Sequence, residues 1–162
     1  MWSNVCLCAA RLLTAGWVGA AALFVVNGVL EVTSPQFDSL VRDQLVLIRF
    51  PAYYLFGFVM VLGGLLATAC AGRILPGRRR VIGLVLLTLA LALMIYDWLR
   101  IYSPLQALLS PPGQPRTPDF RVLHVWSEVV NTIDVTLALA AAVVLCWPTR
   151  PGGTLPSASA PP

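Results

Sequence analysis

The sequence is poor in charge, and the few charges that it has are of restricted type. Only 11% of its 162 residues are charged, whereas 58% are hydrophobic. Soluble domains carry about 25% charged residues, so this composition excludes an ordinary soluble protein and indicates a membrane protein. Lysine is absent, and all eleven basic residues are arginines. They are dispersed at the ends of apolar segments, which is a topology signal, and the sequence predicts no nucleic-acid binding.

Residues that support catalysis or metal binding are also scarce. The single histidine, His124, argues against a haem held by two histidines of one chain, and a metal ion would need about three protein ligands. No phosphate-binding loop, nucleophile elbow or paired-histidine zinc motif is present. The four cysteines lack the C-x-x-C spacing of thiol oxidoreductases, and we interpret them as small apolar filler. The sequence therefore predicts no enzyme, no catalytic residue and no cofactor, and it leaves metal binding open.

Long apolar runs, in contrast, are abundant. Four of them are long enough to cross about 30 Å of hydrocarbon as helices: 12–30, 50–72, 81–99 and 121–147. We therefore predict an all-α fold, an integral membrane bundle of four transmembrane helices that occupies residues 12–147. Residues 1–11 are predicted to form a cytoplasmic N-terminal segment, and the low-complexity residues 148–162 a disordered C-terminal tail. Tyr53 and Tyr54, near the start of the second run, are typical of an interfacial aromatic belt.

The connections between the runs predict the topology. The short loop 73–80 holds four arginines beside two spans, and such basic loops stay in the cytoplasm. We therefore expect an integral protein of the cell (inner) membrane with both termini in the cytoplasm. In the first loop, 31–49, we expect Asp43 to be solvated and residues 37–46 to form a short interfacial helix. The third loop, 103–119, is rich in proline and glycine and is predicted to be irregular and exposed.

The last span begins with a polar stripe on an otherwise apolar helix. The stripe consists of His124, Ser127, Glu128, Asn131 and Asp134. These residues fall within an arc of about 120° of a helix surface, while large apolar side chains take the other side. A narrow stripe of this kind faces other helices or a watery cavity rather than lipid. It is therefore the first place to look for a functional site.

The predicted topology brings further polar residues to the same, non-cytoplasmic half of the bundle. Glu31 ends the first span, and Asp97 and Arg100 end the third. Ion pairs of Arg100 or Arg121 with an acid of this group would stabilise charges that are costly inside a membrane. The predicted polar cluster, which is also the candidate ligand-binding site, comprises Glu31, Asp97, Arg100, His124, Ser127, Glu128 and Asn131.

Two interpretations of this cluster remain open. In the first, His124 and Glu128, which are neighbours at i and i+4, form a buried hydrogen bond, and the cluster holds the bundle together. In the second, the cluster binds a small ligand, a proton or a metal ion. Asp134 is likewise either a neutral carboxyl group that is hydrogen-bonded to a neighbour such as Asn27 or part of a proton relay.

These features predict a multi-pass integral membrane protein without enzymatic activity. The alternative is a small transporter or permease-like subunit, which would be oligomeric because four helices leave little room for a path within one monomer. A membrane metal-dependent enzyme that uses His124 and Glu128 is a third and less favoured class. The expected partners are the lipid bilayer and, as open options, a second copy of the chain or another membrane protein.

The residues that open the last span also form a motif. Phe120-x-x-Leu123-His124-x-x-Ser127-x-x-x-Asn131 follows Tyr102, Pro104 and a variable proline-rich loop, and Ser34-Pro35-Gln36-Phe37 follows the first span. This pattern resembles the transmembrane-protein-205-like family, known in bacteria as the DUF4149 domain. The resemblance implies a four-helix integral membrane protein and singles out His124, Ser127 and Asn131, but it implies no biochemical activity. Glu128 and the long proline-rich loop are not matched to the family pattern.

Overall fold

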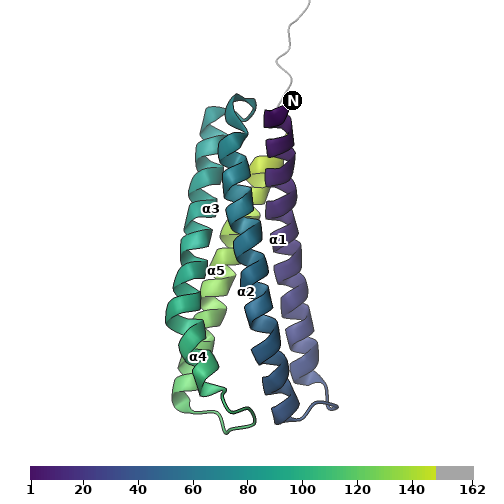
Figure 1. The fold of residues 1–162 in the computed structure, drawn as a ribbon, viewed down its shortest axis with the longest axis vertical. Coiled ribbons are helices and arrows are strands. Elements are labelled where there is room, and N and C mark those ends of the chain that lie inside the picture. Colours follow the sequence, from purple (N-terminus) through teal and green to yellow (C-terminus); the bar gives the residue numbers. More distant parts are fainter. Residues whose placement is uncertain (149–162) are drawn as a thin grey trace, which may run out of the picture.

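The computed structural model describes residues 1–148, and every regular element in these residues is a helix (Figure 1). The elements are α1 (Trp2–Thr33), α2 (Ser39–Cys70), the 3₁₀ turn η1 (Gly72–Ile74), α3 (Gly77–Asp97), the π turn η2 (Trp98–Tyr102), α4 (Ser103–Leu108) and α5 (Pro118–Cys146). Four segments are long and apolar enough to span a membrane: Trp2–Thr33, Ser39–Cys70, Gly77–Leu108 and Pro118–Cys146. The predicted all-α bundle of four membrane-length helices is confirmed. The predicted tail lies outside the described residues except for Pro148.

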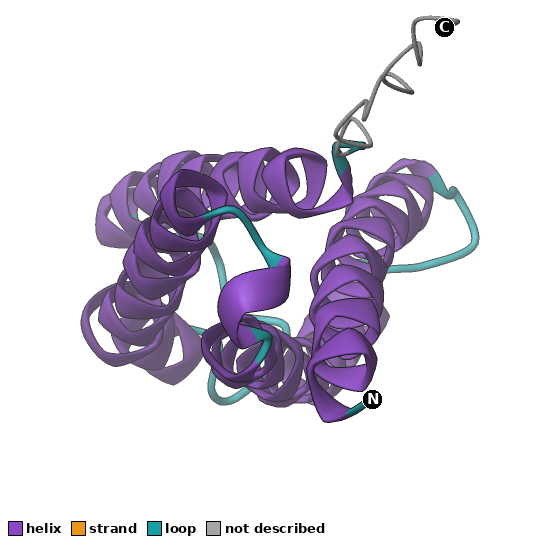
Figure 2. Ribbon diagram, turned by 90° about the horizontal axis from the view of Figure 1, so that it is seen from above, coloured by secondary structure: helices purple, strands orange, loops and turns teal. Residues whose placement is uncertain are grey.

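The four long helices form a four-sided bundle. α1 packs against α2 and α5, and α3 packs against the same two helices. In Figure 1 the upper end holds the N-terminus and the turn between α2 and α3, and the lower end holds α4 and the α1–α2 connection. The view down the bundle shows helices joined by loops (Figure 2). Many large apolar side chains are exposed on the outside, as contact with lipid requires.

Two helices are longer than the apolar runs that predicted them. α1 begins at Trp2 and includes the predicted N-terminal segment except for Met1, which is its N-cap residue. α2 begins at Ser39, so that the predicted interfacial helix 37–46 is the first part of the second span and not a separate element. Asp38 starts α2 as its N-cap, because its carboxylate accepts a hydrogen bond of 2.8 Å from the Val41 backbone N–H.

Small residues bring α1 close to its neighbours in the upper half. Ala10 of α1 and Ala138 and Ala141 of α5 are all 0% exposed. Gly57 of α2 makes room for the ring of Trp17, since a Cβ atom added at this glycine would lie 2.6 Å from Trp17 Cη2. Small residues allow this close approach between membrane helices. The upper half is therefore tightly packed.

A π turn follows Asp97 and decides which residues of the third span face the core. The Ser103 backbone N–H donates to the Trp98 carbonyl, five residues earlier. In a regular α-helix, Tyr102 would lie about 140° around the axis from Asp97. The wider π turn instead places it one turn below Asp97, and Asp97, Ile101 and Tyr102 are all at most 5% exposed. Single π turns inside helices are frequent at functional sites.

Candidate functional site

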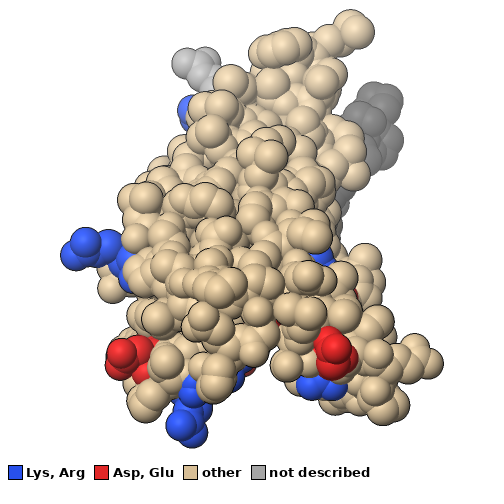
Figure 3. Space-filling model, turned by 60° about the horizontal axis from the view of Figure 1, so that its bottom comes forward, with Lys and Arg blue, Asp and Glu red and all other residues tan. Residues whose placement is uncertain are grey.

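The lower half of the bundle contains a cleft between α1 and α2 on one side and α4 and α5 on the other. Its larger part has a volume of about 820 Å³. A smaller part of about 320 Å³ lies nearer the lower end and shares Arg42, Phe50 and His124 with the larger one. The lower end is hollowed between two groups of charged side chains (Figure 3). The last buried residue of α1 is Ala21, and many of the residues beyond it line the cleft.

A polar network with the carboxylate of Asp97 at its centre adjoins the cleft, which is lined by its members Tyr53, Ser127 and Asn131. Asp97 Oδ2 accepts hydrogen bonds from the Tyr54 hydroxyl, from Asn131 Nδ2 at 3.0 Å and from Ser127 Oγ at 3.4 Å. The Tyr53 hydroxyl donates to Asn131 Oδ1 at 3.2 Å. Asp97 is 1% exposed, and its Oδ1 has no hydrogen-bond partner among the described residues. The network therefore joins α2, α3 and α5 through one buried carboxylate.

His124 and Glu128 form a separate pair on α5, in which Glu128 lies level with this network and His124 about one turn below Ser127. His124 Nε2 lies 3.3 Å from Glu128 Oε1, and the two side chains are 50% and 63% exposed. Both side chains line the larger part of the cleft. The predicted contact is formed, but it is exposed to the cleft and not buried, and a pair of this kind contributes at most about 1 kcal/mol.

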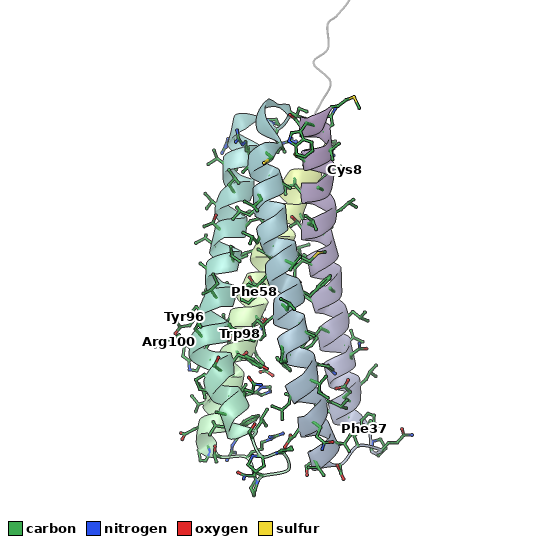
Figure 4. All side chains as sticks on the ribbon, viewed as in Figure 1. Cys8, Phe37, Phe58, Tyr96, Trp98 and Arg100 are labelled. Atoms are coloured by element: carbon green, nitrogen blue, oxygen red, sulfur yellow. The ribbon has the colours of Figure 1, made fainter. Side chains whose placement is uncertain are left out.

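Glu31 and Arg100, the remaining residues of the predicted cluster, lie apart from the network. Glu31 forms an ion pair with Arg49 of α2, and both line the larger part of the cleft. Arg100 is exposed and projects from the outer surface of the bundle (Figure 4). No ion pair of Arg100 or Arg121 occurs among the described residues. The expected pairings with these two arginines are therefore wrong. Both side chains are exposed, and in the case of Arg100 this is because the third span turns Ile101 inward and Arg100 outward.

Two residues of the site were assigned another role from the sequence. Tyr54, expected in an interfacial belt, is 1% exposed and belongs to the network. Asp43, expected to be solvated, is also 1% exposed. Its carboxylate accepts a hydrogen bond of 2.8 Å from the Gly113 backbone N–H and forms an ion pair with Arg116. Asp43 thus ties the connection between α4 and α5 to the lower end of α2.

A third buried acid, Asp134, lies deeper in the bundle. Asp134 is 2% exposed and faces the indole of Trp17, which is fully buried. Neither Asp134 Oδ1 nor Trp17 Nε1 has a hydrogen bond of good geometry among the described residues. Asn27, the expected partner, is exposed on α1. The predicted contact between Asn27 and Asp134 is therefore wrong.

No group of three or more His, Cys, Asp or Glu side chains in residues 1–148 is arranged to hold a metal ion. All four cysteines are free and lie near the upper end of the bundle, where Cys8 points outward (Figure 4). The predicted metal ligands His124 and Glu128 are thus a pair without a third ligand of these types nearby. The cleft offers hydrogen-bonding and charged groups over an apolar lining, which suits a ligand better than a metal ion.

Comparison of the chain with protein families, with curated proteins and with solved structures finds no match in any of the three. The geometry of the cleft is therefore the basis for any proposal about function.

Proposed function

We propose that this protein is a non-enzymatic, multi-pass membrane protein that binds a small ligand in the cleft of its lower half. The observation that carries the proposal is the cleft itself, whose larger part has a volume of about 820 Å³. Ligand sites typically measure about 300–1,000 Å³ and combine an apolar lining with a few placed polar groups. Phe24, Val25 and Val135 provide apolar lining here, and His124 and Asn131 provide polar groups.

The two interpretations of the polar cluster then apply to different residues. Asp97, Ser127 and Asn131 hold the bundle together, because their mutual hydrogen bonds join α3 to α5 at a buried position. A buried polar group without partners is costly, so the hydrogen bonds to Asp97 Oδ2 favour one arrangement of the helices. His124 and Glu128 are half exposed and are available to a ligand in the cleft.

A small transporter or permease-like subunit is the second candidate. It is favoured by the difference between the two halves of the bundle, since the cleft lies in the lower half and small residues close the upper half. In an alternating-access cycle, each end state has a path that is open to only one side of the membrane. A transporter would need a second state in which the upper half opens, and a flux assay in vesicles would detect it.

We also propose that the lower end is non-cytoplasmic and that both termini lie in the cytoplasm of a cell (inner) membrane. The arginines of the upper end support this topology. Arg79 Nη1 donates to the Trp147 carbonyl at 2.9 Å, and Arg11 Nε donates to the Leu145 carbonyl at 2.8 Å, so both also cap the C-terminal end of α5. A cysteine at the exposed Gln114 in a cysteine-free variant should react with a membrane-impermeant thiol reagent on whole cells. Labelling only after lysis would contradict this orientation.

Membership of the transmembrane-protein-205-like family remains a proposal as well. It is supported by the motif that opens α5, in which Ser127 and Asn131 are the residues that bind Asp97. A structure of a family member should then contain the same contact between its third and fourth spans. A different helix order in that structure would contradict the proposal.

The experiment for the proposed ligand site compares two substitutions that are adjacent and chemically identical. Val25 and Val26 are 62% and 53% exposed, and only Val25 lines the cleft. Val25→Trp should therefore fill the cleft, whereas Val26→Trp should only enlarge the outer surface. The detergent-solubilised protein is titrated with monoolein, an uncharged amphiphile, and native mass spectrometry counts the bound molecules.

We expect one bound monoolein in the wild type and in Val26→Trp, and none in Val25→Trp at the same concentration. Equal binding by all three proteins would mean that the lipid sits on the outer surface. In that case the cleft is not a ligand site and the proposal fails.

A further inference from the structure

The smaller, lower part of the cleft carries hydrogen-bond donors and positive charge without a lining acid. Its polar lining residues are Arg42, Tyr102, Gln106, Arg116 and His124. Of the described residues that line it, none is Asp or Glu. Arg116 is neutralised by Asp43 behind it, which leaves Arg42 as the cation of this part. A chamber of this composition favours an anionic group.

Two of these residues have donors that are not used within the protein. Tyr102 is 3% exposed, and its hydroxyl has no hydrogen-bond partner among the described residues. Arg42 donates through Nη2 to the Ser34 carbonyl at 3.0 Å, but its buried Nε has no partner there either. Unsatisfied buried donors are rare in proteins and call for a partner. Both side chains line the lower part of the cleft, so an anion bound there would lie beside both.

The other two basic side chains of this part are held in place by one aromatic ring. The Arg116 guanidinium lies 4.4 Å from the centroid of the Phe120 ring. His124 stacks on the same ring, with 5.7 Å between the centroids. Phe120 itself lines the chamber. The lower part of the cleft is thus preorganised, so that a bound group would order few additional side chains.

The larger part of the cleft continues upward from this chamber along α1 and is mainly apolar. Its α1 lining extends from Val32 up to Ala21, which corresponds to about 16 Å along a helix. This distance is about half of the roughly 30 Å hydrocarbon core of a bilayer, or one leaflet. Of the charged residues that line this part, Glu31 forms an ion pair with Arg49 and Glu128 is paired with His124, so neither acid is without a basic partner.

We propose that the occupant of the cleft is an anionic amphiphile, a lipid of the leaflet at the lower end. Its phosphate or carboxylate binds in the chamber of Arg42 and Tyr102, and its acyl chain lies along α1 and α5 up to the middle of the membrane. This inference rests on the proposed ligand site and adds the chemical class of the ligand. The depth of the cleft and the position of the cation at its lower end support a lipid over a water-soluble anion.

The test compares two lipids that have the same acyl chains but different headgroups, one with a net negative charge and one with none. The solubilised protein is titrated with dioleoyl phosphatidylglycerol and, separately, with dioleoyl phosphatidylcholine, and native mass spectrometry gives the ratio of the two dissociation constants. Arg42→Gln should lower the preference for the anionic lipid about fivefold, the factor expected for one basic residue near an anionic lipid. Arg100→Gln is the matched control, because Arg100 lies in the same half but on the outer surface.

A second, more conservative variant keeps the test valid if Arg42→Gln misfolds. Tyr102→Phe keeps the ring and removes only the unpartnered hydroxyl, so it should fold and should also weaken the preference. Soluble glycerol phosphate, added as a competitor, should displace neither lipid, because it lacks the chain.

Each other outcome overturns the inference in a different way. An equal loss of preference in Arg42→Gln and Arg100→Gln would mean diffuse attraction by surface charge. Displacement by glycerol phosphate would mean a site for a free anion. Binding of both lipids with equal affinity, blocked by Val25→Trp, would leave the ligand site intact but refute its anionic specificity. Failure of both lipids and of monoolein to bind would refute the ligand site as well.

Discussion

Replacement of Tyr54 by phenylalanine tests whether the Asp97 network holds the bundle together. The change removes one hydroxyl and leaves Asp97 Oδ2 with two donors, Asn131 and Ser127. Hydrogen bonds between membrane helices contribute about 0.6 kcal/mol on average and at most about 1.7 kcal/mol. Tyr54 and Asp97 are each 1% exposed, and the bond is made to a carboxylate, so we expect a loss of about 1.5 kcal/mol, near the upper limit.

The assay is the free energy of unfolding in bicelles, measured by steric trapping or by titration with a denaturing detergent. Tyr96→Phe is the control, because Tyr96 is 53% exposed and projects from the outer surface of α3 (Figure 4). It should change the free energy of unfolding by less than about 0.5 kcal/mol. If Tyr54→Phe and Tyr96→Phe have equal effects, the network is not a structural tie and the assignment of Asp97 is wrong.

Three further substitutions test other parts of the structure. Gly57→Ala should destabilise the protein by about 1–3 kcal/mol through overpacking against the indole ring described above, whereas Gly19→Ala, with no atom within 4 Å of its Cβ, should not destabilise it; equal melting temperatures would contradict the packing. Asp43→Asn should release the connection 109–117 and speed trypsin cleavage there, and an unchanged cleavage rate would show that the tie is unimportant. His124→Ala should change the free energy of unfolding by at most about 1 kcal/mol, because its ion pair is exposed; a loss of several kcal/mol would restore the structural interpretation of that pair.

The fold could be predicted because it depends on the number and length of the apolar runs, which can be read directly from the sequence. Each apolar run has the length that a membrane imposes on a helix. The fold is an all-α membrane bundle whichever of the four helices pack against one another. The ends of the helices were harder to predict from the sequence. α2 extends to Ser39 because the amphipathic residues before the second apolar run continue the same helix, and an apolar window cannot distinguish that continuation from a separate interfacial segment.

The candidate site could be predicted only in part. Ser127 and Asn131 meet Asp97 as members of the predicted cluster, because a polar stripe on an apolar helix must turn inward. The role of Tyr54 could not be deduced, since a tyrosine near the end of a span serves equally well in an interfacial belt and in a buried network. Arg100 was misplaced because the π turn that moves it outward leaves no recognisable pattern in the sequence.

Asp43 shows a further limit of the sequence. It is buried only because the connection between α4 and α5 folds back onto it, 70 residues along the chain, where Gly113 provides an N–H donor. No residue near Asp43 in the sequence predicts that contact. The sequence does indicate that Asp43 needs a partner, since an acid in an apolar stretch requires one. It does not indicate where in the chain that partner lies.

The central claim is that the cleft between α1 and α5 is a ligand site open to lipid, and photo-crosslinking tests it most directly. A benzophenone amino acid is placed at Val135, which is half buried and lines the cleft, and the protein is irradiated in nanodiscs that contain monoolein. We predict a lipid adduct at this position that Val25→Trp suppresses and Val26→Trp leaves unchanged. Adducts of equal yield in all three proteins, or crosslinks to a second copy of the chain in place of lipid, would contradict the claim.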